Sequence, residues 1–159
     1  FNNIDLFDTT FYDTGNLSKD QDRVKAGQVR PFNFDDRGIA LKQTDMYKDF
    51  VNKVNEFQPD LLLLSVVEDT FKQAILLLDS ITDLNIPTLM GGVFITAAPE
   101  VALSYPSVKM VGVGEGEHIV KSVARNLRDN KSLDNIPNLW IKKGNGQIMF
   151  DARGRGERN

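Results

Sequence analysis

The sequence predicts an α/β fold, with a doubly wound, mainly parallel sheet between helices on both faces in a three-layer αβα arrangement. Three observations support this fold class. Apolar runs of strand length alternate with segments whose apolar residues recur at helical spacing, and the connections between them are short. The strand candidates also lack polar alternation, which is typical of strands that are covered on both faces.

The N-terminal part of the chain contains one strand candidate and a long polar stretch. Residues 4–12 place Leu6 and Phe7 among polar residues, which predicts a short strand that enters a loop. Residues 13–43 are rich in glycine and charge, so we expect a long loop there, with a helical turn near 19–24. Loops of this length inside a compact domain are often functional or disordered.

The segments that follow alternate clearly between helix and strand. Thr44 and Asp45 offer an N-cap to a helix that continues to Phe57. The run at 60–67 is almost continuously apolar and predicts a strand that is buried on both faces. Thr70 is expected to cap the next helix.

A second and a third buried strand are predicted further along the chain. Residues 88–90 form the second, which stops at the pair Gly91 and Gly92. A short helix over 99–103 begins with proline at its first position. The third strand covers 108–113 and ends in a glycine-rich loop.

The C-terminal part adds a helix and a hairpin. The helix is predicted over 118–127, and the hairpin joins 139–141 to 147–150 through a glycine-rich turn. We therefore predict one domain over 1–150, followed by a polar tail at 151–159.

The number of strands suggests that part of the sheet is missing. A doubly wound domain of this type has about five strands, whereas about four candidates precede the hairpin. We expect the first strand to precede Phe1, so that the chain is a piece of a longer protein.

Composition excludes several classes of function. The 159 residues carry a formal net charge of −3, which gives no reason to expect nucleic acid or an anionic membrane surface as a partner. No apolar run approaches the roughly 20 residues of a membrane span, and we expect a soluble, cytoplasmic protein. The absence of cysteine excludes disulfides, thiolate metal sites and a cysteine nucleophile within this sequence.

Ligands of open parallel sheets bind beyond the carboxyl ends of the strands. Three predicted loops meet this condition, at 65–70, 91–96 and 112–117. Ser65 could donate its hydroxyl to a ligand, or it could satisfy local backbone. Gly91 and Gly92 lack side chains, so a bulky ligand could rest on the chain there, or they could simply form a tight turn.

The run Gly-Glu-Gly-Glu at 114–117 also has two interpretations. Glu115 and Glu117 could be charges that favour a helix N-terminus, or they could support acid–base chemistry or a divalent ion in an independent enzyme. Two carboxylates without a third ligand are a weak metal signal. His118 is expected to be a solvated residue at the start of the helix, and no catalytic or metal-binding residue is assigned.

Six motifs together resemble a known family. They are Asp-Leu-Leu-Leu-Leu-Ser at 60–65, Ile-Pro at 86–87, Gly-Gly at 91–92, Pro-Glu at 99–100, Gly-Val-Gly-Glu-Gly-Glu at 112–117 and Ile-Pro-Asn-Leu-Trp at 136–140. This pattern is similar to the cobalamin-binding N-terminal domain of class B radical S-adenosylmethionine enzymes, over nearly the whole chain.

The resemblance implies a flavodoxin-like domain that holds cobalamin at the carboxyl edge of its sheet. It also implies a downstream barrel that binds a [4Fe-4S] cluster through three cysteines and cleaves S-adenosylmethionine. Members of the family act as methyltransferases or in ring-forming and oxidative steps on tetrapyrroles, lipids and natural products. Without that barrel this chain would have no turnover of its own. The alternative is a degenerate flavodoxin-like scaffold that uses the same crevice for protein or domain contacts.

The resemblance also implies a set of cofactor-binding residues. The serine after the first apolar run and the residue that follows it would line the nucleotide tail of cobalamin. The double glycine would let the tail pack along the sheet, and the Gly-Glu loop would close the far side of the binding groove. The residues are Ser65, Val66, Gly91, Gly92, Val93, Gly114 and Glu115. A bulky residue at Gly92 is expected to block cofactor uptake while leaving the fold intact. The chain lacks the Asp-x-His-x-x-Gly motif that supplies a cobalt ligand in other cobalamin proteins.

Overall fold

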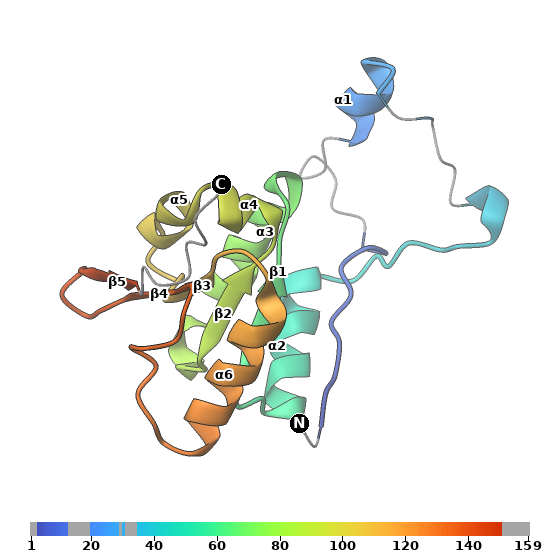
Figure 1. Ribbon diagram of the computed structural model, residues 1–159. Coiled ribbons are helices and arrows are strands. Elements are labelled where there is room, and N and C mark those ends of the chain that lie inside the picture. The colour runs from blue at the N-terminus through green and yellow to red at the C-terminus, as the bar shows by residue number, and fades with distance from the viewer. Residues whose placement is uncertain (1–2, 13–19, 29, 31–34, 151–159) are drawn as a thin grey trace. The chain divides into compact units, whose positions relative to one another are not determined.

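The computed structural model describes residues 3–12, 20–28, 30 and 35–150. The chain divides into two compact units, Phe1–Gln58 and Pro59–Asn159 (Figure 1). Among the helices in the described ranges, none is long and apolar enough to cross a bilayer.

The helices of the first unit are α1 (Asp20–Lys25), η2 (Asp35–Arg37) and α2 (Met46–Phe57). The carboxylate of Asp45 accepts hydrogen bonds from two amides of the first turn of α2, which is the N-cap expected from the sequence. The helix ends where Gln58 adopts a left-handed conformation. The predictions of α2 and of a helical turn in the polar stretch are therefore confirmed.

The strand predicted at 4–12 is wrong. Within the described part of the first unit, this segment makes only one isolated bridge, between Tyr12 and Lys42. A strand requires a ladder of backbone hydrogen bonds, and this segment instead packs through its side chains. The ring of Phe7 lies 5.1 Å from that of Phe50 on α2. Of the two apolar residues that suggested a strand, Phe7 thus packs against a helix, whereas Leu6 is 78% exposed.

Asp49 on α2 receives two side-chain hydrogen bonds. The hydroxyl of Thr44 donates to Oδ2 at 2.5 Å, and the hydroxyl of Tyr12 donates to the same oxygen at 2.9 Å. These bonds favour the charged carboxylate and hold the pKa of Asp49 below its ordinary value of 3.8. The ammonium of Lys42 lies 4.7 Å from the centroid of the Tyr12 ring and completes the cluster.

The second unit is built on a five-stranded sheet with the strand order β1-β2-β3-β4-β5. The first three strands are parallel, and the last two form the predicted hairpin, which joins the sheet through antiparallel pairing of β4 with β3. The sheet is therefore mixed. Its strands are β1 (Leu62–Ser65), β2 (Thr88–Gly91), β3 (Met110–Gly112), β4 (Leu139–Lys142) and β5 (Ile148–Phe150).

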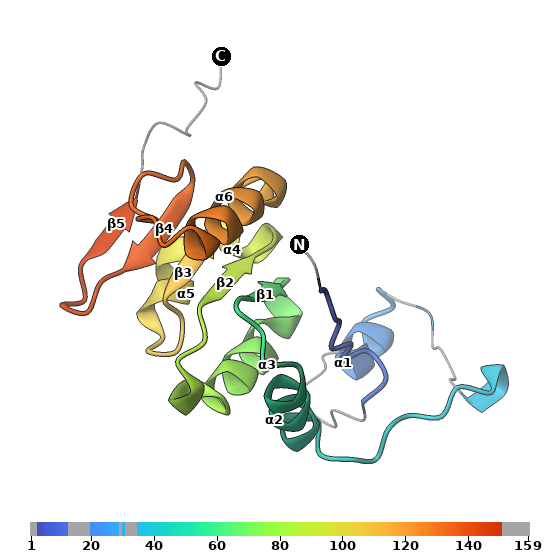
Figure 2. The same ribbon diagram turned by 90° about the horizontal axis from the view of Figure 1, so that it is seen from below.

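Helices cover both faces of this sheet. Helix α6 lies on one face, and α3, α4 and α5 lie on the other (Figures 1 and 2). This arrangement confirms the three-layer α/β fold. The helices are α3 (Glu68–Asp79), α4 (Val93–Ala97), α5 (Pro99–Ser104) and α6 (Gly116–Arg128), with a 3-10 turn η3 (Thr82–Leu84) before β2.

Three helix starts differ from the prediction. Helix α6 begins at Gly116 rather than at 118. Thr70 is not the N-cap residue of α3, because the helix already begins at Glu68 with Val67 in the N-cap position. The hydroxyl of Thr70 instead accepts a hydrogen bond from the Val67 amide at 3.1 Å. Helix α4 occupies most of the region predicted as the loop 91–96. A five-residue helix is too short to show apolar periodicity, so the sequence pattern could not indicate it.

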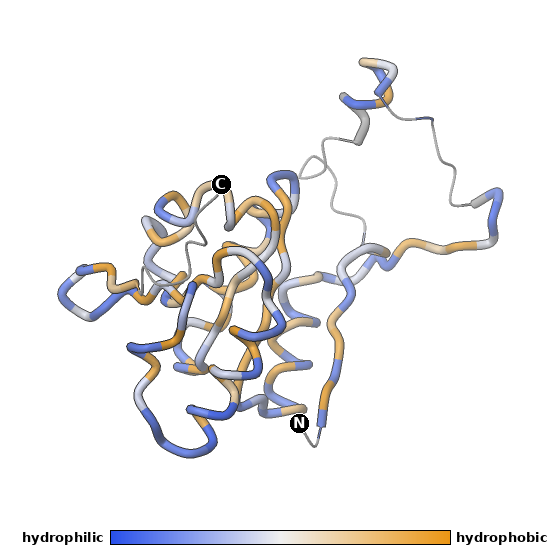
Figure 3. The backbone as a smooth tube through the Cα atoms, in the orientation of Figure 1, coloured by the Kyte–Doolittle hydropathy of each residue, from blue (hydrophilic) through white to orange (hydrophobic). Residues whose placement is uncertain are grey.

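The two faces of the sheet follow the alternation of side chains along the strands. Toward α6, a buried cluster joins the sheet to the helix and the chain before β4; it contains Leu89, Met110, Ile119, Val123, Ile136 and Leu139. On the opposite face, Met90 and Val111 are fully buried. Trp140 is buried in β4 and stacks on Phe150, whereas the hairpin turn is hydrophilic (Figure 3).

Gly92 is held against the backbone that follows β1. Its φ is +110°, and a β-carbon at this position would lie 2.3 Å from the carbonyl oxygen of Val66 and 2.8 Å from its nitrogen. Backbone atoms at such distances cannot move aside without displacing the loop. The expectation that a bulky residue at Gly92 leaves the fold intact is therefore wrong.

We predict that Gly92→Ala lowers the free energy of unfolding by about 2–5 kcal/mol, from combined backbone strain and overpacking. Gly116→Ala is the matched control, because its β-carbon would meet nothing within 4 Å and its φ is not positive. The control is expected to change stability by less than about 1 kcal/mol. Chemical denaturation measures both variants, and equal stabilities would contradict the close contact.

We also predict a pH-dependent effect of Asp49→Asn. Because the folded pKa of Asp49 lies below 3.8, its contribution to stability is present above the unfolded value and is lost as the pH falls through the folded value. The melting temperature of the wild type should exceed that of Asp49→Asn at neutral pH. This difference in melting temperature should disappear as the pH falls below 3.8. Asp83→Asn, an exposed aspartate in η3, controls for the loss of one charge. A gap that is independent of pH would contradict the prediction.

Candidate functional site

The carboxyl ends of the three parallel strands lie side by side. Ser65 at the end of β1 is in register with Gly91 at the end of β2. A β-carbon on Gly91 would in turn lie 3.9 Å from the carbonyl oxygen of Gly112, at the end of β3. The three loops singled out in the sequence therefore share one edge of the sheet.

The same three residues point to one face of the sheet, the face that α6 covers, because side chains alternate along a strand. We call Ser65, Gly91 and Gly112 the strand-end floor. At Gly112 a β-carbon would lie 3.3 Å from Cδ1 of Ile119, so this glycine allows α6 to approach the sheet. Ser65 is exposed, and Leu63, two residues earlier on the same face, is 51% exposed. Helix α6 thus covers the end of β3, whereas the end of β1 stays accessible.

Gly91 has a different environment from its neighbour Gly92. The contact at 3.9 Å is the only one within 4 Å of a Gly91 β-carbon, and the backbone has no positive φ. A side chain at Gly91 would therefore be compatible with the protein but would occupy the space above the floor. At Gly92, in contrast, the positive φ and the nearby backbone of Val66 leave no room for a side chain.

Val66 follows the end of β1 and Val93 begins α4 after β2, and the two side chains differ in exposure. Val66 is only 3% exposed, and its amide donates a hydrogen bond to the carbonyl of Gly91 at 2.9 Å. It belongs to the core and joins the ends of β1 and β2. Val93 is 72% exposed at the start of α4, where it presents an apolar side chain to solvent.

The loop after β3 contains Gly114 and Glu115. Gly114 has a φ of +89° and is exposed, and its amide donates to Oγ1 of Thr96 at 3.0 Å. The Thr96 hydroxyl donates in turn to the carbonyl of Gly92 at 3.2 Å. Sequence reasoning missed Thr96; its one signal was a hydroxyl within an otherwise apolar segment. Glu115 occupies the N-cap position of α6 without a side-chain cap bond.

The ionisable residues near this edge point to no catalytic centre. Glu115, Glu117 and His118 are all exposed, and His118 lies in the first turn of α6 as expected from the sequence. Over the ranges that the structure describes, no group of three or more histidine, aspartate and glutamate side chains could hold a metal ion. The features of this edge that could contact a large ligand are the bare backbone at Gly91 and the exposed hydroxyl of Ser65.

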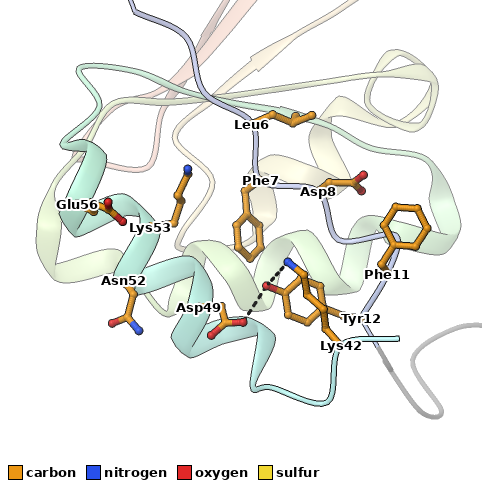
Figure 4. A pocket seen from close by; sticks show the side chains of 10 residues that line it. All are labelled: Leu6, Phe7, Asp8, Phe11, Tyr12, Lys42, Asp49, Asn52, Lys53 and Glu56. Carbon is orange, nitrogen blue, oxygen red and sulfur yellow. Dashed lines mark hydrogen bonds between the residues drawn. The ribbon is translucent and has the colours of Figure 1, made fainter. Parts of the chain in front are cut away.

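A hollow lies in the first unit, between the segment 3–12 and α2 (Figure 4). It has a volume of about 410 Å³ and is open to solvent. Lys42 and Asp49 converge on Tyr12, and Lys53 forms an ion pair with Asp5. Each of these charged groups has a partner within the first unit: Lys42 and Asp49 contact the Tyr12 hydroxyl, and Lys53 contacts Asp5. We therefore interpret this hollow as the packing interface between the N-terminal segment and α2.

Comparison with known proteins identifies the type of domain. A family model described as B12 binding domain matches residues 26–124, which is more than half of the chain. The search among curated proteins gave no match. The matched range includes all three strand ends and the whole strand-end floor.

Two similar solved structures are radical enzymes. TsrM from Kitasatospora setae, a radical S-adenosylmethionine methyltransferase solved with tryptophan substrate and an S-adenosylmethionine analogue, has a TM-score of 0.61 at 17% identity, over 73% of this chain and 25% of TsrM. OxsB, a cobalamin-dependent S-adenosylmethionine radical enzyme solved with aqua-cobalamin and S-adenosylmethionine, has a TM-score of 0.56 at 22% identity, over 66% of this chain and 15% of OxsB. At these identities the likeness shows the fold, and the chain spans a quarter or less of either enzyme.

The strand-end floor fits the cofactor of the matching family. Cobalamin is a large ligand, and Gly91 leaves open the space above the sheet that any side chain would fill. Ser65 adds an exposed hydroxyl beside it. On the match of its family model and on this fit, the chain belongs to the family of B12-binding, or cobalamin-binding, domains.

Proposed function

We propose that this chain is the cobalamin-binding domain of a larger radical S-adenosylmethionine enzyme and does not turn over a substrate by itself. The observation that carries the proposal is the open end of the strand-end floor, where Ser65 and Gly91 offer a hydroxyl and bare backbone beside α6. The fold shared with TsrM and OxsB supports the enzyme class. The motifs at 91–92 and 112–117 agree with it.

The residues implied by the resemblance take distinct roles in this proposal. Gly91 would let the nucleotide tail of cobalamin reach the sheet, and the hydroxyl of Ser65 would hydrogen-bond to a polar atom of the tail. Val93 provides an apolar contact at the rim. Val66 and Gly92 act through their backbones, because they hold the ends of β1 and β2 together.

Gly114 and Glu115 form the far wall of the site in this proposal, at the loop that leads into α6. Bound cobalamin supplies a cobalt centre for group transfer or redox chemistry. The protein supplies the shape of the groove and excludes water from the part of the cofactor that it buries. The reaction of the whole enzyme would be methyl transfer or an oxidative modification, carried out in the cytoplasm.

The remaining parts of the enzyme belong to the same proposal. A radical domain that follows in the same polypeptide would bind S-adenosylmethionine and a [4Fe-4S] cluster. TsrM has been solved with a [4Fe-4S] cluster, and OxsB with S-adenosylmethionine. The competing function is a scaffold whose strand-end floor contacts another protein or domain. The experiments below separate the two.

We predict that the full-length protein retains near-stoichiometric corrin absorbance after incubation with hydroxocobalamin and desalting. Gly91→Leu should weaken binding at least tenfold, because its side chain fills the space above the floor without a backbone clash. Gly144→Leu is the matched control, since this hairpin glycine is exposed and a β-carbon on it would meet nothing within 4 Å. It should bind like the wild type.

Two results would contradict this proposal. Absence of corrin from the folded wild type would favour the scaffold. Unchanged binding by Gly91→Leu, with a normal circular dichroism spectrum, would show that cobalamin does not lie on the strand-end floor.

We further predict that the gene continues past Asn159 into a region that encodes a Cys-x-x-x-Cys-x-x-Cys motif, because thiolates ligate the cluster of a radical domain. Sequencing of the locus tests this directly. A stop codon soon after Asn159 would contradict a radical domain in the same polypeptide and favour the scaffold.

A further inference from the structure

We propose that Thr96 is a positioning residue of the cofactor site, whose hydroxyl sets the shape of the far wall before cobalamin binds. The inference rests on the proposed function. Its starting point is that one side chain connects the loops after two different strands. Thr96 lies in α4, and its Oγ1 contacts backbone groups of both Gly92 and Gly114.

The two hydrogen bonds use the hydroxyl in both directions. Oγ1 accepts from the Gly114 amide at 3.0 Å and donates to the Gly92 carbonyl at 3.2 Å. A threonine or serine hydroxyl can act as donor and acceptor at once, whereas valine has the same shape and can do neither. Thr96 thus ties the loop after β3 to the glycine pair that bounds the strand-end floor.

On the side that faces α4, the hydrogen bond to Thr96 is the main contact described for the loop after β3. A β-carbon on Gly114 would meet nothing within 4 Å, and Gly114, Glu115 and Gly116 are exposed. On the other side, the amide of Val113 donates to the carbonyl of Asn138 at 3.0 Å. The loop is therefore attached at two consecutive amides, one toward the hairpin and one toward α4. Only the second attachment depends on a side chain.

Loss of this side-chain hydrogen bond should weaken cofactor binding, because the loop would no longer be ordered before the cofactor binds. A loop that is ordered before binding does not have to be ordered by the ligand, which lowers the cost of association. One hydrogen bond of this kind corresponds to an affinity change of about threefold to tenfold. The bond also protects the Gly114 amide from exchange with solvent, so the same substitution has an effect that needs no cofactor.

The experiment compares Thr96→Val with Thr96→Ser in the full-length protein. Titration with hydroxocobalamin gives the Kd of each variant, and hydrogen exchange followed by NMR gives the rate at the Gly114 amide without cofactor. We expect Thr96→Val to raise the Kd about threefold to tenfold and to speed the exchange by a similar factor. Thr96→Ser, which keeps the hydroxyl, should restore both values.

Thr82→Val is the matched control. Thr82 lies in η3, before β2 and thus at the opposite edge of the sheet, and its hydroxyl also donates to helix carbonyls, those of Leu78 and Asp79. It should leave the Kd and the Gly114 exchange rate unchanged. An equal effect of Thr82→Val would show that Thr96 acts only through general stability and would overturn the inference.

The remaining outcomes separate this inference from the proposed function. A wild-type Kd for Thr96→Val, while Gly91→Leu fails to bind, overturns the role of Thr96 and leaves the cobalamin site standing. Unchanged exchange at Gly114 in Thr96→Val likewise overturns it, because the tie would then not hold the loop. If the wild type itself binds no cobalamin, both the site and the role of Thr96 are rejected.

Discussion

The close approach of Gly92 to the backbone of Val66 is the constraint on which the proposed site depends. No side chain fits between these two segments, so the chain that leaves β2 must pass directly against the chain that leaves β1. The hydrogen bond from the Val66 amide to Gly91 closes the same junction. Because this contact is made entirely by backbone, no side-chain rotation can relieve it, and a β-carbon on the neighbouring Gly91 would make no such contact.

Glycines near this edge serve four different purposes. Gly92 allows two backbones to touch, and Gly112 allows Ile119 of α6 to approach the sheet. Gly91 leaves open space above the sheet, and Gly114 supplies a positive φ in an exposed loop. A motif rich in glycine therefore does not by itself indicate which glycine faces a ligand. In this domain the surroundings of each missing β-carbon distinguish Gly91, where the space is open, from Gly92, where backbone atoms fill it.

The sequence predicted most elements of the second unit correctly, and the errors have identifiable physical causes. Buried strands were recognisable because their apolar runs need cover on both faces. The strand expected at 4–12 failed because its backbone makes no ladder within the described residues, while Phe7 packs against α2 and Leu6 stays exposed. Thr70 was expected as an N-cap but lies within the first turn, where its hydroxyl bonds back to Val67. Local patterns could not distinguish these cases.

By itself the sequence determined the fold class, the three strand ends that form the candidate site, and the family to which its glycine motifs point. These follow from apolar periodicity and from residues whose backbone freedom is local to them. Only the tertiary structure decided that Gly92 is structural and Gly91 accessible, and that Thr96 contacts Gly114 eighteen residues away. Such roles depend on which atoms surround a residue in the folded structure, and the spacing of residues along the chain does not indicate these contacts.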